Sequence, residues 1–296
     1  MFRNLRLYKV TSDWPDNEAD LSALLQASAF EPCGSLSERS VGWEPPAAEL
    51  PDLLARRVGG ADLLRLRHQS RILPPAAVRE ALELRVAELE ARNGEPLTSR
   101  DKRELKEDIT SRLLPQALLK SDRIDGFFLV REGLLGIATA TPANAERFMD
   151  CLRVALGSLA ATPLAFPRPT SELLTSVFLG VGPKSFHAGR ECRMKDPTEP
   201  TTQVNWLQVD LADTTVRRHV RDGYSVERLG IQYEGVIECV LDGDTVFRKI
   251  KLPGIGEASD DPEESALAKQ DADFALCVSA VSALVAGLRG ALTSDD

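Results

Sequence analysis

The sequence predicts an α+β fold with largely antiparallel sheets, flanking helices and a projecting helical hairpin. Strand-like runs of Val, Ile, Tyr, Phe and Trp fill much of the second half of the chain. Helical patterns occur singly between these runs, without the regular strand–helix alternation of a parallel sheet. The chain has 296 residues, 43% of them hydrophobic, which is enough for a sizeable core.

The first quarter of the chain predicts two strands and one helix. Residues 2–10 alternate apolar and polar side chains as a strand does, and residues 20–29 place apolar side chains at helical spacing. Turn-forming residues at 30–35 end that helix, and 42–46 is interpreted as a second cluster of breakers. Residues 61–73 alternate again and predict a strand with one arginine-bearing face.

A helical hairpin is predicted over residues 75–120. Pro75 suits the first turn of a helix and Gly94 its end, while Thr98 and Asp101 resemble a capping box that opens a second helix. The apolar stripes of the two helices are Val78, Leu82, Val86 and Leu89, and Leu105, Ile109 and Leu113. Each stripe is one residue wide per turn, so most of the hairpin should be wetted by solvent and should project from the body.

The rest of the chain predicts a strand-rich region closed by a helix. Strands are expected within 124–140 and near 190–195, 203–209, 224–232, 234–241 and 245–251, with helices at 141–157, 170–180 and from Pro262 to about Leu288. Asp242-Gly243 predicts a tight hairpin. The most apolar stretch, 274–288, is shorter than the roughly 18 to 20 residues that span a bilayer. It therefore predicts a buried helix and no membrane partner.

Charge is unevenly distributed along the chain. The net charge of -9 argues against a generally adhesive polycation but permits a local basic surface. Six arginines and one acid lie between Arg56 and Arg79, whereas 257–273 holds seven acids and one lysine. Further basic groups are Arg3, Arg6 and Lys9; Lys184, Arg190, Arg193 and Lys195; Arg217, Arg218 and Arg221; and Arg248, Lys249 and Lys251. Such groups are usually solvated faces, unless several converge on one surface.

No motif in the sequence predicts catalysis, a metal site or a cofactor. A phosphate-binding glycine loop is missing, and His68, His187 and His219 lack the spacing of metal ligands. The five cysteines form no Cys-x-x-Cys pair, and the N-terminal residues do not form a secretion signal, so a reduced cytoplasm is expected. Cys33, in a Pro-Cys-Gly turn, is the candidate nucleophile of a hydrolase. Packing of a small apolar side chain before a glycine explains it better.

Several segments together resemble a known family. They are 30–35 (Phe-Glu-Pro-Cys-Gly-Ser), 42–46 (Gly-Trp-Glu-Pro-Pro), 71–75 (Arg-Ile-Leu-Pro-Pro), 113–115 (Leu-Leu-Pro), 156–159 (Leu-Gly-Ser-Leu) and 271–274 (Asp-Ala-Asp-Phe). In order and spacing, over essentially the whole chain, they resemble the RdgC family of bacterial recombination-associated proteins.

The resemblance implies a non-enzymatic protein that forms a ring-shaped homodimer around duplex DNA without sequence specificity, with single-stranded DNA as a further candidate. It implies restraint of RecA-mediated recombination, a role in replication, and a cytoplasmic, nucleoid-associated location. It also implies a central domain from 1–74 and 121–166, a tip domain at 75–120 and a base domain at 167–296. The acidic run at 257–273 should then face away from DNA.

The expected site residues combine this resemblance with the charge pattern. Expected DNA contacts are Arg56, Arg57, Arg65, Arg67, Arg71, Lys102, Arg103, Lys106, Arg112, Lys120 and Arg123. Expected dimer contacts are Leu118, Leu119, Ala275, Ser279, Ser282 and Ala286. Relatives commonly carry Arg and Phe where this chain has Gln116 and Leu118, so the role of that arginine is not transferred.

Two alternatives stay open at the level of sequence. The chain could be a protein-interaction module that contacts recombination or replication proteins without binding DNA. The arginines of 61–73 could solvate an exposed sheet face or pair with Glu80, Glu83 and neighbouring acids. The salt dependence of DNA binding distinguishes the first alternative from phosphate binding.

Overall fold

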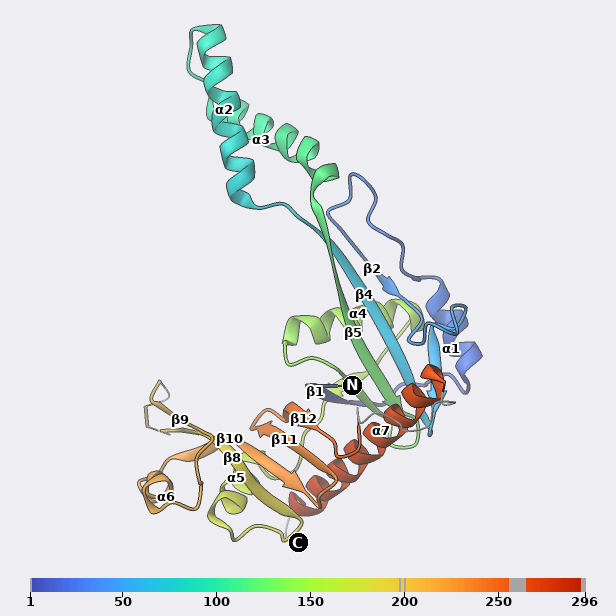
Figure 1. The fold of residues 1–296 in the computed structure, drawn as a ribbon, viewed down its shortest axis with the longest axis vertical. Coiled ribbons are helices and arrows are strands. Elements are labelled where there is room, and N and C mark those ends of the chain that lie inside the picture. The colour runs from blue at the N-terminus through green and yellow to red at the C-terminus, as the bar shows by residue number, and fades with distance from the viewer. Residues whose placement is uncertain (1, 197, 200, 256–264, 294–296) are drawn as a thin grey trace. The chain divides into compact units, whose positions relative to one another are not determined.

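The computed structural model describes residues 2–196, 198–199, 201–255 and 265–293 (Figure 1). The chain forms two compact units. The larger unit comprises Met1–Ala27, Pro45–Arg65 and Asp125–Asp296, and the smaller comprises Ser28–Glu44 and Leu66–Ile124. Strands β4 (Ala61–Ile72) and β5 (Leu118–Leu129) each have residues in both units.

The larger unit is built on antiparallel strands. Its other strands are β1 (Leu5–Val10), β3 (Ala55–Val58), β6 (Leu134–Ile137), β7 (Ala161–Pro163), β8 (Phe186–Lys195), β9 (Gln203–Leu207), β10 (Ser225–Tyr233), β11 (Ile237–Asp242) and β12 (Val246–Lys251). The hydrogen-bonded order is β5, β6, β1, β12, β11, β10, β8, β9, while β3 pairs with β4 and β7 pairs with β1. This confirms the α+β class with a large antiparallel sheet.

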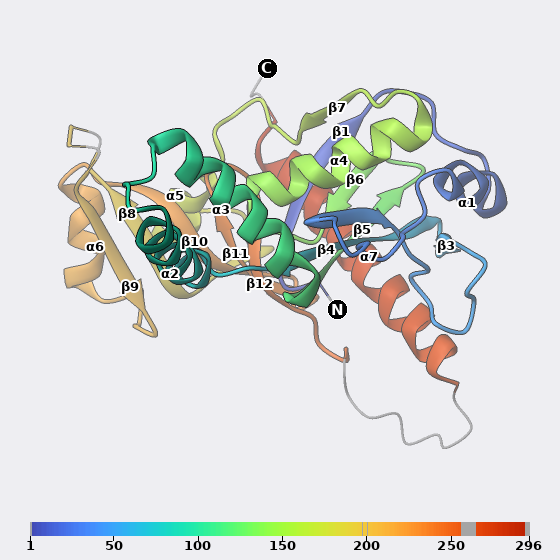
Figure 2. The same cartoon turned by 90° about the horizontal axis from the view of Figure 1, so that it is seen from above.

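Helices of the larger unit cover both faces of its strands. They are α1 (Glu18–Gln26), α4 (Pro142–Leu156), α5 (Thr170–Leu179), α6 (Thr214–Arg221) and α7 (Ala266–Ala291). Helix α7 lies along β11 (Figure 1), and its buried side chains join Leu229, Ile231 and Leu241 in one hydrophobic core. Helix α4 covers β5 and β6 (Figure 2), with Phe148 so close to the backbone that a Cβ at Gly126 would lie 2.4 Å from its ring.

The smaller unit contains β2 (Arg39–Trp43), the adjoining parts of β4 and β5, and the helices α2 (Pro75–Asn93) and α3 (Ser99–Leu113). A 3-10 turn, Leu114–Gln116, follows α3. Gly94 ends α2 in the left-handed conformation with φ 75°, and Thr98 and Asp101 form the predicted capping box. Val78 is the only buried residue of α2, and Ile109 is the only buried residue of α3. The other residues of the two predicted apolar stripes are not fully buried.

The interpretation of 42–46 as a breaker cluster is wrong for its first two residues. Gly42 and Trp43 end strand β2, and Trp43 is 1% exposed. The backbone of Ser28 and Phe30 hydrogen-bonds Trp43, and a Cβ at Gly42 would lie 2.5 Å from the Phe30 Cα. Glycine is therefore required by the close approach of two chain segments, and a turn does not explain it.

The last helix ends slightly later than predicted. The predicted start at Pro262 lies outside the described residues, and α7 continues to Ala291. Its 26 residues include an 18-residue window of mean hydropathy 1.7, so by length and composition alone it could span a membrane. However, Phe274, Cys277 and Leu288 are fully buried in the core of the larger unit. The prediction of a buried helix is confirmed for the face of α7 that carries these three residues.

Candidate nucleic-acid interface

The two arginines of β3 lie on opposite faces of the sheet. Arg56 is paired in register with Leu63 and Arg57 with Asp62, and neighbouring residues of a strand point to opposite sides. The two side chains therefore leave the sheet on opposite faces, and their contact with DNA stays a prediction. Side chains two residues apart in a strand share a face, as Arg65, Arg67 and Arg71 do, whereas consecutive residues such as Arg56 and Arg57 do not.

Arg56 binds an acid from the segment expected to face away from DNA. Its Nη2 lies 2.7 Å from Asp271 Oδ2 in α7, and its Nη1 lies 3.6 Å from Glu18 Oε2. The hydrogen bond to Asp271 raises the pKa of Arg56. The basic and acidic segments of the sequence therefore meet here, although residues 257–264 of the acidic run lie outside the described part of the chain.

Arg57 forms a two-bond ion pair with a buried acid of the larger unit. Its Nε and Nη2 donate to the two carboxylate oxygens of Asp62 at 2.6 and 2.8 Å. Asp62 is fully buried and also accepts the Trp14 indole N–H at 2.7 Å. Asp62 raises the pKa of Arg57. Both carboxylate oxygens are therefore occupied, and Arg57 is committed to the fold.

The arginines of β4 also have internal partners. In the larger unit, Arg65 Nε donates to Asp125 Oδ1 at 2.6 Å. In the smaller unit, Arg67 lies 4.4 Å from the centre of the Phe30 ring and 3.5 Å from Glu44 Oε2. These acids differ from the Glu80 and Glu83 considered from the sequence.

Arg71 binds backbone carbonyl groups. Its Nη1 donates to Pro115 O at 3.2 Å and to Ala117 O at 3.3 Å, and its Nη2 donates to Gly34 O at 3.1 Å. One side chain thus connects β4 with the turn after α3 and with the loop before β2. Replacement of Arg71 would remove three charge-assisted hydrogen bonds of the smaller unit.

Helix α3 carries the most exposed of the predicted cations. Its intrahelical pairs are Arg100–Glu104 at 3.0 Å, Arg103–Glu107 at 3.3 Å and Arg112–Asp108 at 2.9 Å. The Arg103 side chain is 83% exposed, Lys106 is exposed, and Lys102 reaches Glu90 of α2 at 3.3 Å. Exposed pairs of this kind contribute only about 0.3–0.5 kcal/mol, so an incoming phosphate can replace the carboxylate at little cost.

The first residues of β5 add two further exposed cations. Lys120 Nζ lies 2.9 Å from Asp122 Oδ2, and Arg123 contacts Glu44, the same acid that Arg67 approaches. Both basic side chains are more than half exposed. Together with α3 they give the smaller unit a set of accessible positive charges.

The predicted dimer contacts differ in accessibility. Leu118 and Leu119 are 77% and 47% exposed, unusual values for leucine side chains in a strand. On α7, Ser279 and Ala286 are exposed, whereas Ser282 donates to Glu132 Oε1 at 2.6 Å and Ala275 packs against Gly59. Ala275 and Ser282 are therefore used, at least in part, for contacts within the subunit. At Ala275 the helix lies so close to Gly59 that a longer side chain would not fit.

The structure brings together three arginines that the sequence placed in separate groups or did not single out. Arg193 of β8, Arg228 of β10 and Arg248 of β12 lie on the sheet face opposite the one covered by α5 and α7. The register pairs Arg228 with Arg193 on one side and with Asp242 on the other. In the sequence, the alternation of Arg228 with Leu229 and Ile231 indicates only which face Arg228 occupies. The sheet order is what places β8 beside β10, and β12 one strand further away across β11.

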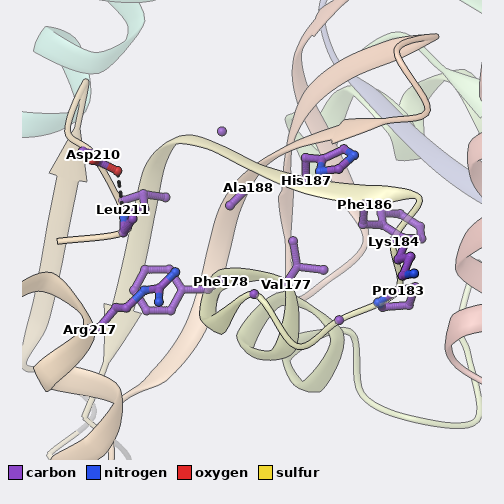
Figure 3. A pocket seen from close by; sticks show the side chains of 14 residues that line it. Val177, Phe178, Pro183, Lys184, Phe186, His187, Ala188, Asp210, Leu211 and Arg217 are labelled. Carbon is purple, nitrogen blue, oxygen red and sulfur yellow. Dashed lines mark hydrogen bonds between the residues drawn. The ribbon is translucent and has the colours of Figure 1, made fainter. Parts of the chain in front are cut away.

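A hollow of about 500 Å³ lies between α5, α6 and the loop that precedes β8 (Figure 3). Arg217 lies beside Phe178 on one side of the hollow, while Lys184 and His187 lie on the other side. These basic residues belong to two groups noted in the sequence, but they do not converge on a common point. The hollow therefore offers no multidentate anion site.

The cysteines are packed side chains. Cys33 is 8% exposed, its N–H donates to Gln69 Oε1 at 2.9 Å, and its Sγ lies 3.5 Å from Gln69 O. Burial raises the pKa of Cys192, Cys239 and Cys277 to about 12, which disfavours the thiolate. The geometry agrees with the packing interpretation of Cys33.

Residues 1–295 match the family described as "Putative exonuclease, RdgC". The chain belongs to the RdgC family. It is 33% identical to the recombination-associated protein RdgC of Pseudoalteromonas atlantica over 93% of this chain and 92% of that protein. It is 31% identical to the protein of that name from Laribacter hongkongensis, and 32% identical to that from Xanthomonas campestris pv. campestris, over 98% of this chain and 97% of each relative.

The family membership confirms the association with recombination. The family description mentions an exonuclease, whereas the names of these relatives state no catalytic activity. Nucleases of the two-metal type need a cluster of carboxylates around the metal ions. Within the described ranges, no group of three or more His, Cys, Asp or Glu side chains is placed to hold a metal ion. The described residues of this RdgC-family chain therefore present basic surfaces and no recognisable metal centre.

Proposed function

We propose that this RdgC-family protein binds DNA without sequence preference and, as a ring-shaped dimer around the duplex, restrains RecA-mediated recombination. The observation that carries the proposal is the set of exposed cations on α3, above all Lys102, Arg103 and Lys106. Positive side chains that are accessible and weakly paired can bind phosphates and release counterions. Phosphate contacts carry no base information, so binding should not depend on sequence.

The buried pairs support a different role for part of the predicted set. Arg57 directs two guanidinium hydrogen bonds to a fully buried carboxylate and others to the carbonyl oxygens of Pro15 and Asp16, and Arg65 is bound to Asp125 in a half-buried pair. Breaking such pairs costs far more than breaking an exposed pair on a helix. We therefore assign DNA contact first to α3 and to the start of β5, and assign Arg57 to the fold.

Replacing Lys102, Arg103 and Lys106 together with alanine should weaken binding equally on two unrelated duplexes. Loss of three phosphate contacts should reduce the slope of log affinity against log salt by about 3, since each contact contributes about 0.9. Fluorescence anisotropy at several salt concentrations measures both quantities. The matched control is the triple alanine variant of Arg153, Arg168 and Arg289, which changes the net charge equally. Equal losses in the two variants would show that only total charge matters and would reject α3 as the contact surface.

The same proposal includes a dimer held in part by Leu118 and Leu119. Light scattering at micromolar concentration should give twice 32.3 kDa. Replacing both leucines with aspartate should shift the mass toward the monomer, because each introduces a charge that would be buried in the contact. Leu84→Asp on α2, where the leucine is 65% exposed, is the control and should leave the mass unchanged. A monomeric wild-type chain across this range would contradict the ring.

We further propose a non-enzymatic role in the cytoplasm, at the nucleoid, that affects recombination and replication by occupying DNA. Enclosure of the duplex would let modest electrostatic attraction suffice, because a closed ring must open or slide off an end to release it. The competing function is contact with recombination proteins without DNA. An apolar protein contact would have a much flatter salt dependence than phosphate binding.

A further inference from the structure

Three arginines on one face of the larger unit's sheet are held by two acids, and one of these acids is buried and bound by two of the arginines. This arginine cluster consists of Arg193, Arg228 and Arg248. Asp242, only 8% exposed, lies 3.2 Å from Arg248 Nε and 3.7 Å from Arg228 Nη2 through the same oxygen, Oδ2. Its other oxygen accepts the backbone N–H of Val246 at 3.0 Å.

The second acid near the cluster is also shared. Glu227 is the extra residue of a β-bulge between Val226 and Arg228, and it lies 3.7 Å from Arg193 Nη2 and 3.2 Å from Lys195 Nζ. Four cations thus contact two carboxylates, mostly over long distances. In the described part of the chain, the Nε atoms of Arg193 and Arg228 are buried and have no acceptor.

Without a bound anion, this arrangement of positive charges destabilises the folded protein. Like charges directly opposite each other on antiparallel strands are destabilising, and Arg228 faces Arg193 in register. Burial lowers the pKa of Arg228, and the neighbouring charges of Arg193 and Arg248 lower it further. By contrast, Arg57 holds Asp62 through two short bonds. Asp242 and Glu191 raise the pKa of Arg228 but do not offset its burial and the neighbouring positive charges, whereas the pKa of Arg57 is raised overall.

The surface beside the cluster has room for a larger ligand. A hollow of about 430 Å³ includes Gly230, two residues beyond Arg228 on β10. Its charged lining consists of Arg190, Lys249 and Lys251 with the acids Glu191 and Glu238, and Glu191 is paired with Lys249 at 2.5 Å. Gly230 and Gly189 oppose each other so closely that a Cβ at Gly189 would lie 3.2 Å from the Gly230 carbonyl. Glycine within a strand often marks close approach of a ligand or another backbone.

We propose that the arginine cluster binds a phosphate group of a DNA backbone. A phosphodiester supplies two anionic oxygens, which guanidinium groups bind in a forked geometry. The hollow at Gly230 would accommodate the adjoining sugar and base. This inference rests on the proposed DNA binding and places one of its contacts on β8, β10 and β12, away from α3.

The test compares the wild-type chain with the double variant Arg193→Gln, Arg228→Gln in two measurements. The first is the unfolding temperature in inorganic phosphate and in sodium chloride of equal ionic strength. A ligand that binds the folded state raises this temperature, so phosphate should stabilise the wild type and not the variant. In chloride the variant should be at least as stable as the wild type, because the repulsion is removed. A merely structural role predicts a loss of stability instead.

The second measurement is duplex affinity by fluorescence anisotropy across a salt series. The double variant should bind more weakly on every duplex, with a salt slope smaller by about 2. The control variant Arg153→Gln, Arg168→Gln removes two cations that are each paired with an acid three or four residues away, and it should have little effect. Arg228→Lys keeps the positive charge but loses the forked guanidinium geometry. Its duplex affinity should therefore lie between those of the wild type and the double variant.

The outcomes separate this inference from the function on which it rests. If phosphate gives no specific stabilisation and the double variant binds DNA like the control, the cluster is not a phosphate site, although DNA binding stands. Phosphate stabilisation with unchanged DNA affinity would overturn the assignment to DNA in favour of free phosphate. If the wild type fails to bind DNA at any salt concentration, the proposed function falls and the assignment to DNA falls with it.

Discussion

Raising the salt concentration from about 50 to about 200 mM should weaken duplex binding by about 10³- to 10⁵-fold, the loss expected for about six to ten phosphate contacts. The exposed cations of α3 and β5, with the arginine cluster of the larger unit, supply that number of positive groups. Each contact releases condensed counterions, and this release becomes less favourable as bulk salt rises. Anisotropy on two duplexes of unrelated sequence measures the slope, which should agree between them.

This experiment also tests the competing protein-interaction function. Binding to a protein partner through apolar contacts should change little over the same salt range. As a control, the titration is repeated with sodium glutamate in place of sodium chloride. The released cation is then the same in both titrations, and only the anion that competes for the protein differs. A slope near zero, or binding to one duplex only, would contradict sequence-independent phosphate contact and favour the alternative.

Elements with strong local signals could be predicted from the sequence. Thr98 and Asp101 satisfy each other's backbone N–H groups within four residues, and Gly94 adopts a conformation that other residues avoid. The Asp242-Gly243 turn similarly joins β11 to β12 as predicted. In each case the physical cause is contained in a few consecutive residues, so the tertiary structure is not needed.

Two short elements with little apolar periodicity were not predicted. Strand β3 has only four residues, and it exists because Arg56 and Arg57 pair with Leu63 and Asp62 across the Gly59-Gly60 turn. Helix α6 carries three arginines and a histidine in eight residues, and Val216 is its one fully buried side chain. Neither segment has the length or apolar periodicity on which sequence interpretation relies.

The sequence could indicate that basic residues form the candidate site, but it could not indicate which acid each of them pairs with. Alternation correctly indicates which residues of a strand share a face, yet it cannot identify the acid that a given arginine meets. Arg56 pairs with Asp271, 215 residues further along the chain. Arg228 meets Arg193 and Asp242 only because the sheet places β10 between β8 and β11. Charge counts therefore overestimated the positive surface at β3 and β4, and they missed the arginine cluster.

The pairing of each arginine separates structural from binding roles. A guanidinium with two short bonds to a buried carboxylate has no unused capacity, and removing it would leave a buried charge. A guanidinium with long, shared contacts retains capacity for an incoming anion. This criterion assigns Arg57 to the fold and makes Arg228 a candidate for phosphate, whereas the α3 cations are candidates because their pairs are exposed.

Asp62→Ala should lower the free energy of unfolding by about 3–5 kcal/mol, because it leaves the partly buried Arg57 guanidinium without its carboxylate partner. The Trp14 indole N–H also loses its acceptor. Urea unfolding followed by tryptophan fluorescence measures the loss. Asp108→Ala on α3, where the pair with Arg112 is exposed, is the control and should change stability by less than about 0.5 kcal/mol.

Asp62→Asn distinguishes the two roles of Arg57 in the same protein. The amide keeps one acceptor but removes the negative charge, so stability should fall by less than in Asp62→Ala. If Arg57 serves the fold, duplex affinity below the unfolding transition should equal that of the wild type. Tighter DNA binding by Asp62→Asn would mean that Asp62 normally competes with phosphate for Arg57. That result would return Arg57 to the DNA-contacting set, because neutralising its partner would have released a cation for the backbone.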